Sequence, residues 1–295
     1  MTTANRGYIT VATRHRRYLE MAVDMALSLR EHNPDPISIV VDKQMQRILD
    51  RHYAGIFDQV ILLPTRYELG RARKYYVARA TPYAYTFFLD ADAFILGSMT
   101  PLWLSARGCS VGLVGEMVQG ETDQAHHDFL ISDLMHEFEL DGYLKNNSSL
   151  FYFEKKAGMQ FLDDCFELYR DQIYTPTRRA QGWIGDELAL AIVGGRAGVN
   201  LCHIPAPFYW ANELAERTPT DLHRPMITFL DIASQEVIDW LVTNARRRRR
   251  EAGVRDITPI HWWIESQLNG SWSHWLPRGS QRYKMALRIM NYFSG

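Results

Sequence analysis

Two aspartates two positions apart, Asp90 and Asp92, follow directly on the apolar run Tyr85 to Leu89 (YTFFL). A second apolar run, Ala93 to Leu96, comes next, so the pair leaves a segment typical of a buried strand. Two carboxylates at such a place are costly to desolvate unless a cation compensates them. Their hard oxygen ligands suit Mn²⁺ or Mg²⁺, so the pattern predicts a divalent-metal site.

A metal held there could bridge the diphosphate of a nucleotide donor and act as a Lewis acid on the leaving group. The alternative is structural: Asp90 caps a turn and Asp92 is only solvated. The tripeptide alone does not separate the two interpretations, because Asp-x-Asp pairs also arise by chance. Its place at the end of an apolar strand favours the metal site.

The elements that position these carboxylates alternate between strand and helix patterns. We expect strands at Tyr8 to Ala12, Ile37 to Val41, Gln59 to Leu63 and Tyr85 to Leu89, separated by helical stretches that include Arg71 to Ala80. Apolar strands joined in this way predict a Rossmann-like α/β fold, with a mostly parallel central sheet and helices on both faces. Ligands bind such sheets at the carboxyl ends of the strands, here Ala12-Thr13, Asp42 and Asp90.

The second half is less regular. Strands are expected at Ser110 to Gly115, Leu150 to Phe153, Val199 to His203 and Thr258 to Trp262, and helices around residues 159–169 and 185–193.

The net charge of −1 gives no bulk field that would favour nucleic acid or membrane. No apolar run is long enough to span a bilayer, and the N-terminus lacks a signal-peptide pattern, so a cytoplasmic location is expected.

Cysteine spacing predicts neither a zinc site nor a disulfide framework. The three cysteines, Cys109, Cys165 and Cys202, are expected to act as small buried apolar residues.

Five consecutive arginines, Arg246 to Arg250, stand out in a C-terminal region that carries ten basic and three acidic residues after residue 240. They are either a solvated face or a site for phosphate groups.

Several motifs in order resemble those of the retaining glycosyltransferases related to glycogenin and to the bacterial galactosyltransferases of lipopolysaccharide synthesis. The matching segments are VAT at 11–13, Lys74 in RKYYVARATPYAYTFFLDAD, NNSSLFYF at 146–153, GDELALAIV from Gly185, and PIHWW at 259–263. The resemblance implies a GT-A fold and a metal-dependent transfer of a hexose or pentose with retention of configuration. The donor is a nucleotide-diphosphate sugar, with a UDP-sugar favoured.

The resemblance also implies roles for single residues. Metal ligands would be Asp90, Asp92 and His261, with His203 and His274 as rivals of His261. Asp186 and Glu187 would be catalytic, near the anomeric carbon. The donor would contact Thr10, Ala12, Thr13, Lys74, Asp90, Ala91, Asn147 and Ser148.

Each assignment has a structural alternative. Asp186 could be a helix N-cap, Lys74 a solvated helix charge and His261 a core histidine. Two positions depart from the family: Glu187 stands for the usual Gln, and Ser149 for the usual Gly. These departures keep a second function open, a non-catalytic module of the same fold that binds a nucleotide sugar or a polyanion. A nucleotidyltransferase is disfavoured, because VATRHRRYLEMA after the first strand lacks the glycines that cradle phosphate.

The domain prediction is a catalytic and nucleotide-sugar-binding domain over residues 1–240. The basic segment 241–295 then completes the metal site and contacts the acceptor or a membrane surface. The acceptor itself, whether glycan, glycolipid, protein or other polyanion, is not encoded in a motif. An apolar stripe beside Arg282, Lys284 and Arg288 fits either peripheral membrane contact or packing against the sheet.

Overall fold

The computed structural model describes residues 5–68, 72–127, 129–174, 185–196, 200–228 and 233–255. These residues belong to two compact units. Unit 1 runs to Tyr209 and includes Arg224–Thr228, and unit 2 contains Trp210–His223 and the chain from Phe229 onward. None of the helices in the described ranges is long and apolar enough to cross a bilayer.

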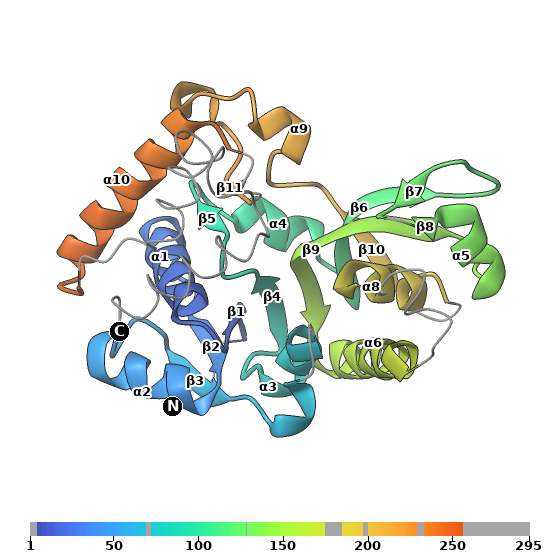
Figure 1. Ribbon diagram of the computed structural model, residues 1–295, viewed down its shortest axis with the longest axis horizontal. Coiled ribbons are helices and arrows are strands. Elements are labelled where there is room, and N and C mark those ends of the chain that lie inside the picture. Colours follow the sequence, from blue (N-terminus) through green and yellow to red (C-terminus); the bar gives the residue numbers. More distant parts are fainter. Residues whose placement is uncertain are drawn as a thin grey trace, which may run out of the picture. The chain divides into compact units, whose positions relative to one another are not determined.

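Unit 1 begins with the alternation of strands and helices that the sequence predicts (Figure 1). The elements are β1 (Arg6–Ala12), α1 (Arg16–His32), β2 (Ile37–Val41), α2 (Lys43–His52), β3 (Gln59–Leu62), η1 (Thr65–Tyr67), η2 (Ala72–Tyr76), α3 (Val77–Ala80) and β4 (Tyr85–Leu89). All four predicted strands are confirmed. The helix expected over 71–80 is instead a 3-10 segment, η2, followed by the single turn α3.

The rest of unit 1 adds the other edge of the sheet and the helices that cover it. Its elements are β5 (Phe94–Ile95), α4 (Thr100–Ser105), β6 (Val111–Val118), β7 (Ala125–His126), β8 (Phe129–Leu130), α5 (Ile131–Glu137), β9 (Tyr143–Glu154), α6 (Lys155–Tyr174), α8 (Asp186–Gly194), β10 (Leu201–Ile204) and β11 (Met226–Ile227). The strand expected at 258–262 lies outside the described residues.

The central sheet has seven strands in the order β10-β6-β9-β4-β1-β2-β3. The pairs β1–β2, β1–β4 and β2–β3 are parallel, as predicted, and β10 is parallel to β6. The strand β9 is antiparallel to both of its neighbours, β4 and β6. It has 12 residues, far more than the expected Leu150 to Phe153, because its polar first half is also buried in the sheet.

Alternate residues of the central strands pack on opposite faces of the sheet. On one face the Trp103 indole Nε1 donates to the Tyr8 hydroxyl at 2.8 Å, and the same indole packs edge-on against Phe87. On the other face Phe88 stacks on Phe151 with ring centroids 4.6 Å apart. Apolar side chains on both faces explain why these strands lack an alternating pattern, and helices flank the sheet as expected.

The disulfide between Cys109 and Cys202 corrects the expectation that each cysteine is a lone apolar residue. The two lie 93 residues apart in sequence, but β10 pairs with β6, which begins at Val111, and the Cα atoms come within 5.7 Å. Only Cys165 is free and buried, as predicted. Disulfides persist mainly in oxidising compartments, and the predicted cytoplasmic location stays a prediction.

Unit 2 contains α9 (Ala211–Leu214), η3 (Pro219–Asp221) and α10 (Gln235–Glu251). The arginine run forms the last turns of α10, and the interpretation as a solvated face is wrong for two of its members. Arg248 is 7% exposed and Arg249 is 0% exposed. The Arg249 guanidinium donates to the carbonyl of Arg255 at 3.2 Å. The predicted division at residue 240 stays a prediction.

Candidate active site

The Asp90-Ala91-Asp92 segment forms a tight turn between β4 and β5. The amide of Asp90 donates to the carbonyl of Ser149 at 2.8 Å, and the amide of Ala93 donates to the carbonyl of Asp90 at 3.1 Å. The first hydrogen bond therefore attaches the turn to β9, and the second closes the turn itself. Ala91 is buried within it, at 6% exposure.

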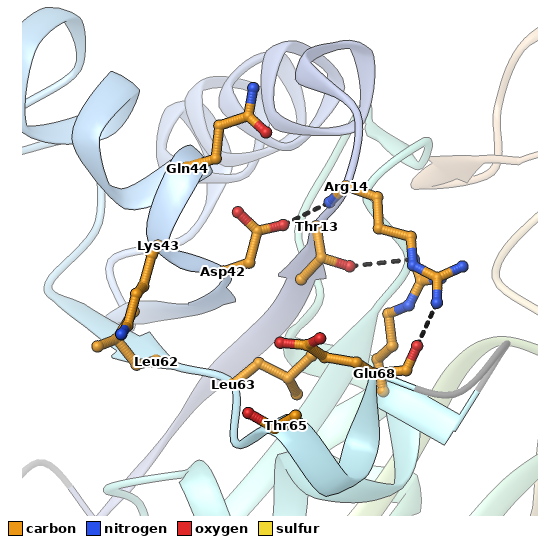
Figure 2. Close-up of a pocket in the computed structure, with 10 residues that line it drawn as sticks. Thr13, Arg14, Asp42, Lys43, Gln44, Leu62, Leu63, Thr65 and Glu68 are labelled. Carbon is orange, nitrogen blue, oxygen red and sulfur yellow. Dashed lines mark hydrogen bonds between the residues drawn. The ribbon is translucent and has the colours of Figure 1, made fainter.

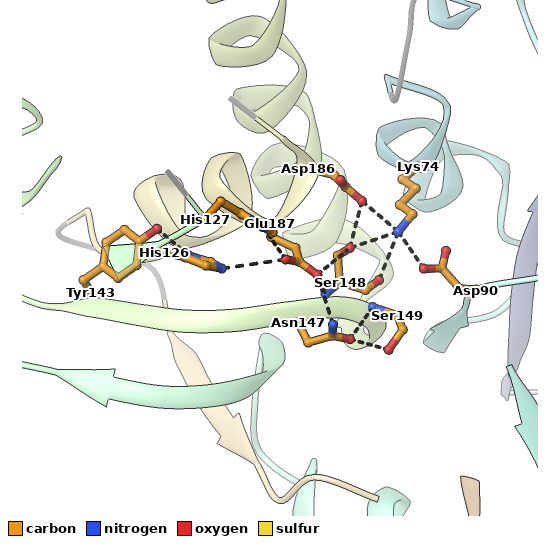
Figure 3. Close-up of polar contacts among 10 residues, drawn as sticks. All are labelled: Lys74, Asp90, His126, His127, Tyr143, Asn147, Ser148, Ser149, Asp186 and Glu187. Atoms are coloured by element: carbon orange, nitrogen blue, oxygen red, sulfur yellow. Dashed lines mark hydrogen bonds and ion pairs between the residues drawn. The ribbon is translucent and has the colours of Figure 1, made fainter. Parts of the chain in front are cut away.

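Lys74 is the centre of a charged cluster that joins three elements (Figure 3). Its Nζ lies 2.8 Å from Asp90 Oδ2 and 2.7 Å from Asp186 Oδ2. It also donates to the Ser148 hydroxyl at 3.0 Å. The side chain is only 19% exposed, so the alternative of a solvated helix charge is wrong.

The cluster shifts the pKa values of its members. Burial alone would lower the pKa of the Lys74 ammonium, but Asp186 and Asp90 raise it well above its usual range. Burial raises the pKa of Asp90 to about 7, against the attraction of Lys74 and with a further rise from the Asp92 carboxylate. The single positive charge of Lys74 thus does not fully balance the negative charges of the Asp90, Asp92 and Asp186 carboxylates.

Asp186 begins α8, but it is not the helix cap. The N-cap residue is Gly185, so no side-chain hydrogen bond caps the helix. The Asp186 carboxylate instead accepts from the Ser148 hydroxyl at 2.8 Å and pairs with Lys74. Its negative charge in the first turn is also favoured by the helix dipole. The capping alternative is therefore wrong, and Asp186 faces the same cluster as Asp90.

Glu187 faces a second group of donors. Its Oε1 accepts from the Asn147 side-chain amide and from the Ser148 backbone amide, each at 3.0 Å. Its Oε2 lies 2.6 Å from His127 Nε2. Burial would raise the pKa of Glu187, but hydrogen bonds from His126, His127 and the Ser148 amide lower it to about 2.

Ser149, where the family has glycine, is accommodated without strain. Asn147 Oδ1 accepts from the Ser149 amide at 3.0 Å and also from its hydroxyl. The Ser149 side chain is thus held against β9. Asn147 and Ser148 are both buried and belong to the network around Asp186 and Glu187, and their role in donor binding stays a prediction.

A cavity of about 530 Å³ opens at the carboxyl ends of the first three strands, where ligand binding is expected (Figure 2). Asp42 Oδ2 accepts from the Arg14 amide at 2.5 Å, and its Oδ1 accepts from the Met45 amide at 2.9 Å. Arg73 Nη1 donates to the Thr13 hydroxyl at 3.0 Å. The lining residues are Thr13, Arg14, Asp42, Lys43, Gln44, Leu62, Leu63, Thr65, Glu68 and Arg73.

Of the three residues predicted to frame the nucleotide, only Thr13 lines this cavity. Thr10 and Ala12 are fully buried in β1, and the Thr10 hydroxyl has no partner among the described residues. Sequence reasoning missed Arg14 and Arg73. A signal was present, since Arg14 follows the first predicted strand and Arg73 stands at the basic start of the predicted helix 71–80, but charge alone does not identify which arginines face a ligand.

The third metal ligand is not placed. His261 and its rival His274 lie outside the described residues. The other rival, His203, is in β10, and two strands, β6 and β9, separate β10 from β4. Sequence reasoning also missed the contact of His126 and His127 with Glu187, because 60 residues separate His127 from that carboxylate.

No family model and no curated protein matches the sequence. Solved structures do match. The galactosyltransferase LgtC, in complex with donor and acceptor sugar analogs, aligns at 13% identity with a TM-score of 0.52 over 88% of this chain and 99% of its own. The WbbM bifunctional glycosyltransferase aligns at 11% identity with a TM-score of 0.54 over 90% of this chain and 52% of its own.

The chain has the GT-A fold. The predicted resemblance and the predicted α/β class are confirmed at the level of the fold. Within this GT-A sheet the cavity lies beyond β1, β2 and β3, and the Lys74 cluster lies at the end of β4. These strands are neighbours, so the cavity and the cluster open at the same edge of the sheet.

Proposed function

We propose that the chain is a glycosyltransferase that takes a hexose or pentose from a nucleotide-diphosphate-sugar donor, with a UDP-sugar favoured. The observation that supports this proposal most strongly is the cluster in which Lys74 forms ion pairs with Asp90 and Asp186 at the end of β4. The acceptor is a glycan, glycolipid, protein or other polyanion. The resemblance of the sequence motifs to the retaining glycosyltransferases supports retention of the anomeric configuration.

A divalent Mn²⁺ or Mg²⁺ fits the donor set at Asp90 and Asp92. The raised pKa of Asp90 reflects a partly buried carboxylate beside a second carboxylate, whose combined negative charge Lys74 alone does not balance. Hard carboxylate oxygens are the ligands these ions prefer. When bound, the ion would neutralise the charge that develops on the leaving diphosphate. His261 is proposed as the third ligand.

The remaining residues bind and orient the donor. The cavity beside Thr13 and Arg73 takes the base and ribose, and the two arginines there, Arg14 and Arg73, suit the phosphates attached to them. Lys74 directs its ammonium toward the phosphates or sugar, and Asn147 and Ser148 supply polar groups for sugar hydroxyls. The Asp186 carboxylate stabilises positive charge at the anomeric carbon.

Removal of one metal ligand tests this proposal. In a thermal-shift screen of nucleotide diphosphates and nucleotide sugars, one nucleotide should stabilise the protein only with Mn²⁺. At about 100-fold excess over Kd the gain is roughly 2.7 kcal/mol. Asp92→Ala should lose this shift, because the remaining carboxylate cannot hold the ion.

Controls separate the outcomes of this screen. Asp163→Ala removes an exposed carboxylate that pairs with Arg79, and it should keep the full nucleotide shift. NMR of the product should show a retained linkage, and an inverted one contradicts the retaining assignment. If Mn²⁺ and a nucleotide stabilise the chain but no sugar is transferred, the non-catalytic binding module is correct. The absence of any shift rejects nucleotide-sugar binding altogether.

A further inference from the structure

A second polar cluster lies beyond Glu187, on the side away from Lys74 (Figure 3). It contains His126 at the end of β7, His127 in the following turn, and the Glu187 carboxylate at the start of α8. One ligand atom from each residue can be chosen so that all three atoms lie within 4.8 Å of one another. Neither the proposed donor site nor the proposed Mn²⁺ site uses the two histidines.

The two imidazoles are held in a parallel arrangement that directs both toward one carboxylate oxygen. Their ring centroids are 4.8 Å apart and their planes differ by 14°. His126 Nε2 lies 3.7 Å from Glu187 Oε2, and His127 Nε2 lies 2.6 Å from it. His127 has a left-handed backbone, with φ of 54°, a conformation that is uncommon for histidine and turns its ring beside that of His126.

His126 has the support that ligating histidines have in metal sites. It is buried at 5% exposure, and its Nδ1 lies 2.7 Å from the Tyr143 hydroxyl. Burial raises the pKa of Tyr143, so this hydroxyl stays neutral and its oxygen can accept a hydrogen bond from Nδ1–H. In the metal-bound form, the tautomer with hydrogen on Nδ1 would present the Nε2 lone pair to the ion beside Glu187.

We propose that His126, His127 and Glu187 bind a transition-metal ion of the Zn²⁺ class, separately from Asp90 and Asp92. Two imidazole nitrogens and a carboxylate suit zinc better than they suit Mn²⁺ or Mg²⁺. Such a set leaves a fourth position for water or a substrate oxygen. The bound ion fastens the β7–β8 hairpin to the first turn of α8.

The distances require little movement. With metal–ligand bonds of roughly 2.0–2.2 Å, tetrahedral ligand atoms lie about 3.4 Å apart. The pair from His126 to Glu187 is already near this separation, at 3.7 Å. The His127 contact must open from its hydrogen-bonded 2.6 Å, and that side chain, 48% exposed, has the freedom to do so. The ion replaces the proton shared by His127 and Glu187, which passes to solvent.

Calorimetric titration with Zn²⁺, in excess Mg²⁺ that occupies oxygen-ligand sites, tests the proposal. Wild-type protein should bind one ion saturably in addition to any other site. His127→Asn, which tolerates the left-handed backbone, and Glu187→Gln should both lose that ion. Tyr143→Phe should bind roughly 10–100-fold more weakly, because it removes a group that orients a ligand.

His136→Asn is the matched control, since it removes an exposed histidine on α5 outside the cluster and should bind Zn²⁺ as wild type does. The visible spectrum of bound Co²⁺ reports the geometry independently and should show tetrahedral absorption in the wild type and in His136→Asn, but not in His127→Asn or Glu187→Gln. Equal Zn²⁺ binding by wild type and His127→Asn overturns the proposal, as does no binding by wild type. Either result leaves the Mn²⁺-dependent nucleotide shift untouched, so the two proposals fail separately.

Discussion

Lys74→Met is expected to lower the free energy of unfolding by about 3–5 kcal/mol, the usual cost of breaking a buried ion pair from one side. Methionine keeps most of the apolar stem and loses the ammonium, whose Nζ lies 5.4 Å from the Phe88 ring centroid in the native protein. It removes the charge, however, and leaves Asp186, 4% exposed, and Asp90, 24% exposed, without their shared cation. Urea denaturation of both proteins measures the difference.

The matched control for Lys74→Met is Arg79→Met. Arg79 pairs with Asp163 in α6, but both side chains are well exposed, at 39% and 29%. Pairs of this kind contribute about 0–1 kcal/mol. If Lys74→Met costs no more than Arg79→Met, the Lys74 cluster does not hold the end of β4 against η2 and α8. Transfer activity should also fall in Lys74→Met, and it should remain in Arg79→Met.

Removal of the Cys109–Cys202 disulfide is expected to have a similarly large effect. In the chain-entropy description, a cross-link that closes a loop of 93 residues stabilises the folded state by about 4–5 kcal/mol at 25 °C. The Cys109→Ser, Cys202→Ser double variant and the reduced wild type should therefore unfold at lower urea concentration than the oxidised wild type. Thermal unfolding with and without a reducing agent provides the same comparison.

Cys165→Ala provides the control for the disulfide. The Cys165 thiol is buried and free, so this variant should still respond to a reducing agent as the wild type does. Thiol counting under denaturing conditions should find one reactive thiol in the oxidised wild type. Three reactive thiols in protein purified without a reducing agent would contradict the disulfide.

Local patterns in the sequence determined the strands at 8–12, 37–41 and 85–89 and the position of Asp90 at a strand end. A run of apolar residues predicts a strand from neighbouring positions alone, and parallel strands bring their carboxyl ends to one edge. The ligand edge of the sheet could therefore be inferred before the structure was known. The family resemblance added Lys74, Asn147, Ser148, Asp186 and Glu187, and the structure places these side chains in one connected network.

Only the tertiary structure decided which buried polar groups meet. The first half of β9 has a polar sequence, yet Asn146 to Ser149 are buried because β9 lies between β4 and β6, two strands that come well before it in the sequence. The same strand order pairs β10 with β6 and so brings Cys202 to Cys109. Likewise, the hairpin after β6 carries His127 to Glu187. A buried charge or thiol takes its partner from strands adjacent in space, and periodicity within one segment carries no information about that adjacency.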